Sequence, residues 1–248
     1  MRRLLLTAIA VTLPLAIAGR ATADDDPKVT ITKAIDAHGG KHKLEKYKAS
    51  KSKGKGVISL FGMDLEFTVE TMSQIPDKLK TTIKMEINGM AITVEQTVNG
   101  DKMSMSLNGM SMEIPDAQKG DLKSAMMQQR ILQLTPLLDK DIELKSIPGV
   151  KVGDKETVGV AVNSKGAKEV KLYFDKSTHL LAMVERMGTA PMSTDEVKQE
   201  IILSDYKEVQ GMKRPTKTVM NNDGKKFMES TVSEQKYLEK LDDKDFSD

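Results

Sequence analysis

The chain has 248 residues, with 38 Lys or Arg against 36 Asp or Glu, and its formal net charge is +2. Basic and acidic side chains are interleaved rather than clustered and Trp is absent, which argues against a nucleic-acid-binding protein. The chain also has no cysteine, so its stability must come from a hydrophobic core rather than from disulfide bonds.

Residues 1–23 have the features of a secretory signal peptide. Arg2 and Arg3 precede the apolar run 4–18, which is short for a membrane span, and the small residues Ala21-Thr22-Ala23 follow it. We predict cleavage after Ala23, which leaves 35 basic and 36 acidic residues in the mature chain. No cysteine lies near this site for lipid attachment, so we expect a soluble protein of the periplasm that is not lipid-anchored.

Two short helices are predicted at the start of the mature chain. Asp26-Pro27 is typical of a helix start, with Asp as the N-cap and Pro in the first helical position. Gly39-Gly40 ends this helix, and a second helix is expected over residues 41–48.

An antiparallel meander is predicted for residues 53–114. Apolar and polar residues alternate strictly over most of this segment, which is the pattern of strands with one buried face. Asn88-Gly89, Asn99-Gly100 and Asn108-Gly109 separate the runs, and Asn-Gly favours hairpins because both residues tolerate positive φ. Methionine recurs on the apolar face, and its flexible thioether suits a surface that accepts more than one apolar shape.

A lone helix is predicted after the meander, at about 121–138, where apolar residues recur at roughly helical spacing. Further strands are expected between 142 and 237, and the acidic end, 239–248, is expected to fray. Residues 24–248 show no linker, so we predict a single domain. Its fold class is α+β but mostly β, with a single curved antiparallel sheet (an incomplete β-barrel) and helices covering its concave face.

Three sets of short motifs have a family resemblance. They are Ala37-His38-Gly39-Gly40 with Leu44, Leu172-Tyr173-Phe174-Asp175 with Thr178-His179-Leu180-Leu181, and Asp205-Tyr206-Lys207-Glu208-Val209 with Gly211 and Pro215-Thr216-Lys217. With the order of elements, they resemble the LolA/LolB-like superfamily of outer-membrane lipoprotein-sorting proteins over most of residues 28–240. The resemblance implies an incomplete barrel around an apolar cavity, a lid of helices and a carrier without catalytic activity. It transfers no individual functional residue.

The apolar face of the meander is the predicted ligand site, where a lipid or lipoprotein acyl chain would be buried. The predicted cavity lining is Met63, Leu65, Phe67, Ile83, Met85, Met90, Ile92, Met103, Met105, Met110 and Met112. Alternate turns of a meander lie at the same end, so an apolar rim is predicted from Phe61, Met63, Met90 and Met110. We expect this rim to admit an acyl chain or to contact a membrane or membrane protein transiently.

Two other functions remain open from the residues alone. Met103, Met105, Met110 and Met112 form two Met-x-Met pairs across a hairpin, and thioethers suit Cu(I), so a periplasmic copper-binding protein is one alternative. The other is a non-catalytic β-domain with a filled core and an interaction role. The sequence has no nucleophile elbow, phosphate-binding loop or paired-histidine zinc helix, so we predict neither enzymatic activity nor a cofactor.

Overall fold

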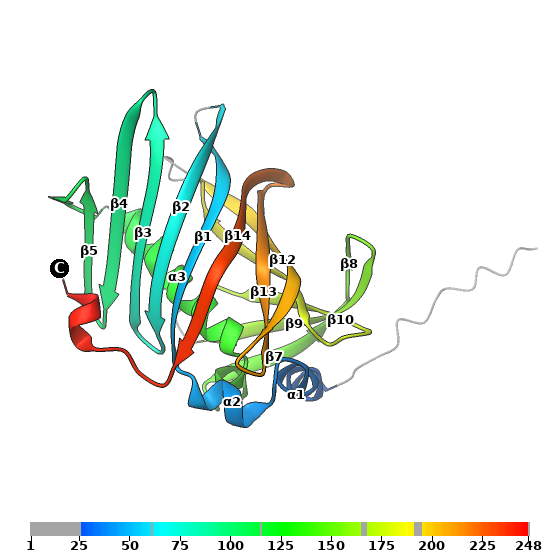
Figure 1. The fold of residues 1–248 in the computed structure, drawn as a ribbon. Helices are drawn as coiled ribbons and strands as arrows, with labels where there is room; N and C mark the ends of the chain where they lie inside the picture. The colour runs from blue at the N-terminus through cyan, green and yellow to red at the C-terminus, as the bar shows by residue number, and fades with distance from the viewer. Residues whose placement is uncertain (1–25, 61, 115, 165–167, 191–194, 248) are drawn as a thin grey trace, which may run out of the picture.

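The computed structural model describes residues 26–60, 62–114, 116–164, 168–190 and 195–247 (Figure 1). The predicted signal peptide, and Phe61 of the predicted rim, lie outside these residues. The cleavage site therefore stays a prediction.

Two helices, α1 (Pro27–Ala37) and α2 (Lys41–Lys46), precede the sheet. The Asp26 carboxylate accepts a hydrogen bond from the Lys28 backbone N–H at 2.9 Å, which confirms the predicted helix start. Gly39 follows α1 with a φ of 121°, and a Cβ at this position would lie 2.6 Å from the Gly211 carbonyl oxygen. Only glycine allows this turn to lie so close to the neighbouring hairpin.

All strands of the long sheet are antiparallel, and the described sheet is not closed. In chain order they are β1 (Ala49–Leu60), β2 (Met63–Gln74), β3 (Lys78–Ile87), β4 (Met90–Asn99), β5 (Lys102–Leu107), β6 (Met110–Met112), β7 (Ile142–Ile147), β8 (Lys151–Val152), β9 (Lys155–Ser164), β10 (Val170–Asp175), β11 (Leu181–Thr189), β12 (Glu196–Val209), β13 (Met212–Asn222) and β14 (Lys225–Leu238). The order across the sheet is β6-β5-β4-β3-β2-β1-β14-β13-β12-β11-β10-β9-β7, with β8 paired to β9 alone. The predicted fold class is confirmed, and the described part of the chain contributes 14 strands to the sheet.

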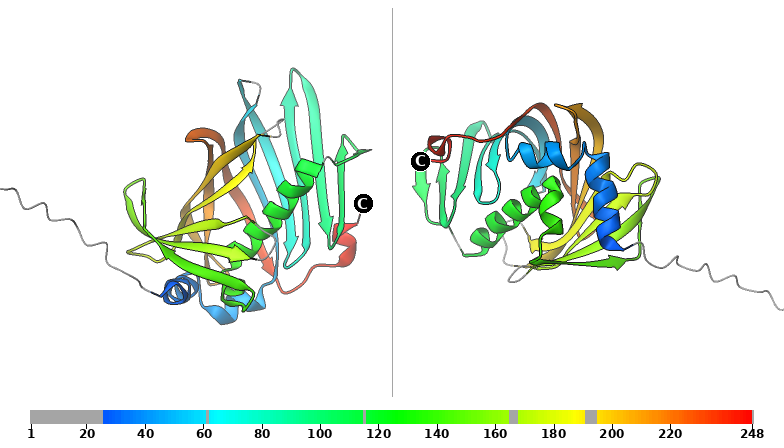
Figure 2. Two further views of the ribbon diagram at one scale, coloured as in Figure 1. Left: turned by 180° about the vertical axis from the view of Figure 1, so that it is seen from behind. Right: turned by 90° about the horizontal axis from the view of Figure 1, so that it is seen from below.

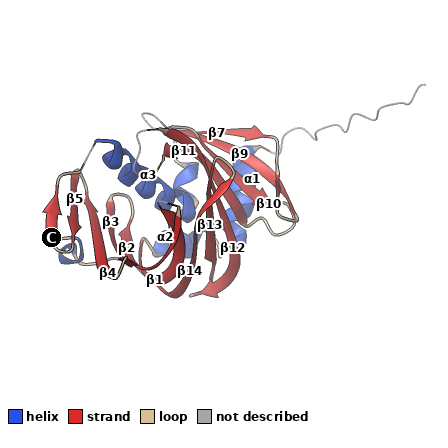
Figure 3. Cartoon of the chain, turned by 90° about the horizontal axis from the view of Figure 1, so that it is seen from above, coloured by secondary structure: helices blue, strands red, loops and turns tan. Residues whose placement is uncertain are grey.

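The central helix α3 (Asp116–Gln133) lies on the concave side of the sheet. It crosses the meander diagonally when seen from behind (Figure 2), and from above the sheet curves around it (Figure 3). The helix begins earlier than predicted, and its expected end forms the separate 3-10 turn η1 (Thr135–Leu138). Its position confirms that a helix covers the apolar face of the meander.

The core divides into one large and one small cluster on the concave side. The large cluster joins α1 and η1 to strands β9–β13 and includes Ile31, Leu134, Leu172 and Ile201, all at most 1% exposed. The small cluster, where α3 packs on the meander, consists of Leu79, Val98, Ile114, Leu122 and Met126. The two clusters hold opposite ends of α3.

The acidic end of the chain, which was expected to fray, is instead packed on the outer face of the meander. Leu241 and Phe246 are 5% and 2% exposed and lie against Ala49, with Phe246 in the 3-10 turn η2 (Asp243–Phe246). Lys78 Nζ lies 2.6 Å from Asp243 Oδ1 and 5.9 Å from the centre of the Phe246 ring. Two apolar residues within an acidic segment are enough to anchor it, because burying each removes a large apolar area from water.

Candidate functional site

A partly open cavity of about 330 Å³ lies between α3 and the concave face of the sheet. Its apolar wall includes Phe67, Val69, Ile83, Leu132, Leu203 and Met228, and its polar wall includes Ser52, Thr71, Gln129, Arg214, Gln235 and Tyr237. This volume is at the lower end of ordinary ligand pockets, about 300–1,000 Å³. It equals about eleven molecules of liquid water at about 30 Å³ each, so the space is a chamber rather than a packing defect.

The cavity exists because β1 has small residues on its concave face. Ser50, Ser52 and Gly54 line the cavity and alternate with outward-pointing lysines, whereas the space over Gly56, the next inward position, is filled by the ring of its pairing partner Phe67 of β2. Short side chains at consecutive inward positions leave a space that neighbouring residues do not fill. This signal lies outside the prediction, because β1 begins at Ala49 rather than at residue 53 and because alternation of large apolar residues does not reveal a row of small ones.

Phe67 forms the wall where β1 has no side chains. A Cβ at Gly56 would lie 2.8 Å from the Phe67 ring and closer still to the Glu229 carbonyl oxygen of β14. The ring therefore lies directly over the glycine, an arrangement in which an aromatic residue compensates for a cross-strand glycine. Phe67 is 6% exposed and separates the cavity from the outer surface.

A buried cation, Arg214 of β13, lines the cavity and is 3% exposed. Its Nη1 donates to the Leu132 carbonyl oxygen at 2.5 Å, and its Nη2 donates to Gln133 Oε1 at 3.3 Å. The guanidinium lies 4.9 Å from the centre of the Tyr237 ring, within cation–π range. Arg214 thus ties the end of α3 to the sheet and places a positive charge at the cavity wall.

His38 and Tyr206 lie beside this cation and also line the cavity. The His38 Nδ1 donates to the Ala34 carbonyl oxygen at 2.7 Å, and the His38 and Tyr206 rings meet edge to face with centroids 5.6 Å apart. Burial lowers the pKa of His38 to about 4, and the positive charges of Arg214 and Lys213 act in the same direction. Burial raises the pKa of Tyr206, whose hydroxyl donates to the Leu181 carbonyl oxygen. Both side chains are therefore neutral near pH 7.

The predicted lining residues share one face of the meander but have different surroundings. Among the described residues, Phe67 and Ile83 border the cavity, whereas Met103 and Met105 pack against the α3 cluster. The half-buried members of this face are Leu65, Met85 and Ile92. The exposed members, between 40% and 68% accessible, are Met63, Met90, Met110 and Met112. The cavity therefore lies further toward β1, β13 and β14 than the methionine pattern indicated.

Three of the exposed methionines lie next to turns at one end of the meander. The β1–β2 and β3–β4 turns lie together at the top of Figure 1, and Met63 and Met90 each begin the strand that follows. Met110 follows the Asn108-Gly109 turn in the same way. An apolar rim formed by these residues stays a prediction.

The alternative copper site is spread along the β5–β6 hairpin. Met105 pairs with Met112, whereas Met110 pairs with Leu107 and Met103 has no partner in β6. Along β5, Met103 lies four residues before Leu107, the partner of Met110. At about 3.3 Å per residue, this separation is about 13 Å. Met105 Sδ also lies 3.8 Å from the Gln96 amide nitrogen. The register brings one methionine from each pair together, not all four.

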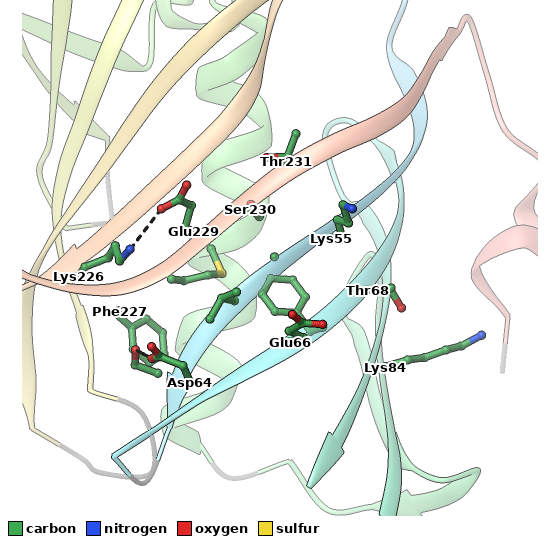
Figure 4. Close-up of a pocket in the computed structure, with 15 residues that line it drawn as sticks. Lys55, Asp64, Glu66, Thr68, Lys84, Lys226, Phe227, Glu229, Ser230 and Thr231 are labelled. Carbon is green, nitrogen blue, oxygen red and sulfur yellow. Dashed lines mark hydrogen bonds and ion pairs between the residues drawn. The ribbon is translucent and has the colours of Figure 1, made fainter.

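A larger hollow, about 630 Å³, lies on the outer face over β14, β1 and β2 (Figure 4). Charged side chains surround it, including Lys55, Glu66 and Lys226. Glu229 at its edge forms ion pairs with Lys217 at 2.8 Å and with Lys226 at 3.3 Å. A charged groove that is more open to solvent suits an apolar ligand less than the cavity beneath α3, so we take the smaller cavity as the candidate site.

In the described part of the chain, no three His, Asp or Glu side chains are grouped so that they could hold a metal ion. None of the described helices is both long and apolar enough to cross a lipid bilayer.

Solved structures identify the class of fold. A LolA superfamily protein from Nitrosomonas europaea aligns with a TM-score of 0.59 and 11% identity, covering 90% of this chain and 97% of that chain. A DUF1329 family protein from Desulfovibrio piger gives 0.58 and 15%, covering 90% and 98%. An outer membrane lipoprotein-sorting protein domain from Vibrio parahaemolyticus gives 0.51 and 12%, covering 89% and 97%.

The chain therefore has the LolA-like fold, as its motifs and order of elements predicted. No family model matches the sequence, and no curated protein matches it. At these identities the likeness to solved structures establishes the fold alone.

Proposed function

We propose that the protein is an exported, non-enzymatic carrier that binds an acyl chain of a lipid or lipoprotein in the cavity beneath α3. The observation that carries this proposal is a partly open chamber beneath α3 with an apolar wall from β2, β3 and α3. The small residues of β1 open this chamber along its floor. The LolA-like fold, shared with an outer membrane lipoprotein-sorting protein domain, supports the same reading.

The volume of the cavity limits the ligand to one chain. A methylene group occupies a volume close to that of a water molecule, so a chamber of 330 Å³ accommodates a single tail of about ten carbons. Burying that tail would contribute about 8 kcal/mol, at about 0.8 kcal/mol per methylene, before the cost of ordering it. Longer tails would extend from the cavity along the uncovered apolar face of the meander.

The methionine rim would provide the route into the cavity. The side chains of Met90 and Met110 are 62% and 68% exposed, and flexible thioethers adapt to chains of different shape. Transient contact of this rim with a membrane or a membrane protein would deliver the acyl chain. Export to the periplasm follows from the predicted signal peptide, and sequencing the N-terminus of the secreted protein should give Asp24 as the first residue.

A cavity-filling variant tests the proposal. Thr71 lines the cavity, whereas Thr68 lies exposed on the opposite face of the same strand. Thr71→Leu should displace one or two methylenes of a bound chain, which would weaken binding of a fluorescent fatty acid about four- to fifteenfold. Thr68→Leu should leave binding unchanged.

Native mass spectrometry of the protein purified from its own compartment should also detect a lipid bound with one-to-one stoichiometry. Absence of probe binding by the unmodified protein would reject the carrier function. Equal weakening by both threonine variants would place the ligand elsewhere.

A further inference from the structure

Arg214 is a buried cation that lacks an acidic partner in the described part of the chain. Its hydrogen bonds go to neutral acceptors, namely the Leu132 carbonyl, the Gln133 amide oxygen and the Met212 sulfur. Its Nε is buried and has no hydrogen-bond partner. A buried charge is costly unless it is paired or bound to a ligand of opposite charge.

The Arg214 guanidinium retains N–H donors without a hydrogen-bond partner, and Arg214 is one of the residues that line the cavity. Arginine has five N–H groups, and the three hydrogen bonds above leave one on Nε and one on Nη1. A planar guanidinium fits carboxylate and phosphate oxygens well. The free donors therefore point to an anionic group as the missing partner.

A second unsatisfied group lies in the same cavity. Gln235 Nε2 donates to the Tyr237 hydroxyl at 2.5 Å, while Gln235 Oε1 is buried and has no partner. The same tyrosine ring lies against the Arg214 guanidinium. An unsatisfied donor and an unsatisfied acceptor thus flank one aromatic ring, and both residues line the cavity.

We propose that this end of the cavity binds the anionic head group, a carboxylate or a phosphate, of a single-chain amphiphile. Both unsatisfied atoms are buried without the ligand, so on binding the two side chains turn toward the head group. The Arg214 N–H groups then contact the anion, Gln235 Oε1 accepts from a hydroxyl of the head group or from its bound water, and the tail extends along Phe67 and Ile83. The ligand would enter with its head group first, so this inference narrows the proposed cargo to a free single-chain lipid and excludes a lipoprotein. This inference rests on the proposed carrier function and adds to it the charge of the ligand.

Four ligands that share one dodecyl tail test this inference by titration calorimetry below their micelle concentrations. They are dodecanoate, dodecyl phosphate, dodecanol and dodecyltrimethylammonium. The unmodified protein should bind the better anion at least about tenfold more tightly than the alcohol, since hydrogen bonds to charged groups are the strong ones. Comparison of the two anions shows which head group fits better, and the cation should bind most weakly.

Arg214→Met removes the charge while retaining much of the side-chain volume. It should abolish the preference for anions, so that the variant binds dodecanoate and dodecyl phosphate no more tightly than it binds dodecanol. Lys213→Met is the matched control, because Lys213 is the exposed neighbour on the same strand, and it should preserve the preference for anions. Equal binding of dodecanoate, dodecyl phosphate and dodecanol by the unmodified protein would overturn the inference, whether or not Arg214→Met folds.

The same titrations separate this inference from the carrier function. If dodecanol binds and the anions show no advantage, the head-group site fails and the carrier function stands. If none of the four ligands binds, the carrier function itself fails. If Arg214→Met retains the full preference for anions, Arg214 is not the receptor and the inference is rejected.

Discussion

Replacing Gly56 with alanine should destabilise the protein by about 3 kcal/mol, the upper part of the usual range for overpacked sites. The added Cβ would lie 2.8 Å from the Phe67 ring and closer to the Glu229 carbonyl oxygen. The ring can rotate, but the carbonyl belongs to the backbone of β14, which pairs with β1 through Gly56 and Ser230. The strands must therefore move apart at the cavity wall.

Urea unfolding followed by circular dichroism measures this effect. If the dependence of the unfolding free energy on urea concentration is the same in both proteins, the substitution has changed stability alone. Gly120→Ala is the matched control, because a Cβ there meets no atom within 4 Å and the residue lies in α3. This control should stabilise the protein by up to about 1 kcal/mol through helix propensity. If Gly56→Ala is as stable as the parent protein, the close approach of β14, β1 and Phe67 described above is incorrect.

Three further predictions concern a buried histidine, the chain end and the methionine hairpin. His38 is 3% exposed, and its pKa falls from 6.5 to about 4, so the unfolded state binds more protons as the pH drops from about 6.5 to 4. The free energy of unfolding should then decrease by up to about 3 kcal/mol over this pH range. Urea titrations at several pH values should show that His38→Gln lacks this decrease, whereas the control His42→Gln, at an exposed site, retains it. Phe246→Ala should lower the free energy of unfolding by about 3–5 kcal/mol, whereas no change in urea unfolding would mean that the end frays. Replacing both Met105 and Met112 with Leu should change the free energy of unfolding by less than about 1.5 kcal/mol and preserve fatty-acid binding. If the unmodified protein binds Cu(I) tightly in a competition assay and the double variant does not, a copper site is favoured instead.

Local sequence patterns were sufficient to predict most of the meander. Strict alternation shows which side chains share a face, and Asn-Gly dipeptides place the turns, because both signals act over only a few residues. The observed positive φ of Asn88, Gly89, Asn108 and Gly109 agrees with those predicted turns. The short strand Lys151–Val152 was not predicted, since two residues are too few to show alternation.

The chain end shows where composition was misleading. Its acidic residues indicated a solvated tail, but Leu241 and Phe246 are buried against β1. Their burial depends on an outer patch that includes Met72, on a strand far away in the sequence. Nothing within the segment itself reveals that patch.

The sequence by itself determined the LolA-like class of fold, the apolar face of the meander and the helix that covers it. Only the tertiary structure decided where the cavity lies and which groups line it. Gly54 of β1, Arg214 of β13 and Gln235 of β14 meet at one cavity, although long stretches of chain separate them. Periodicity reports the face on which a residue lies, whereas a cavity depends on the volumes of side chains brought together by strand order and curvature, which no local pattern contains.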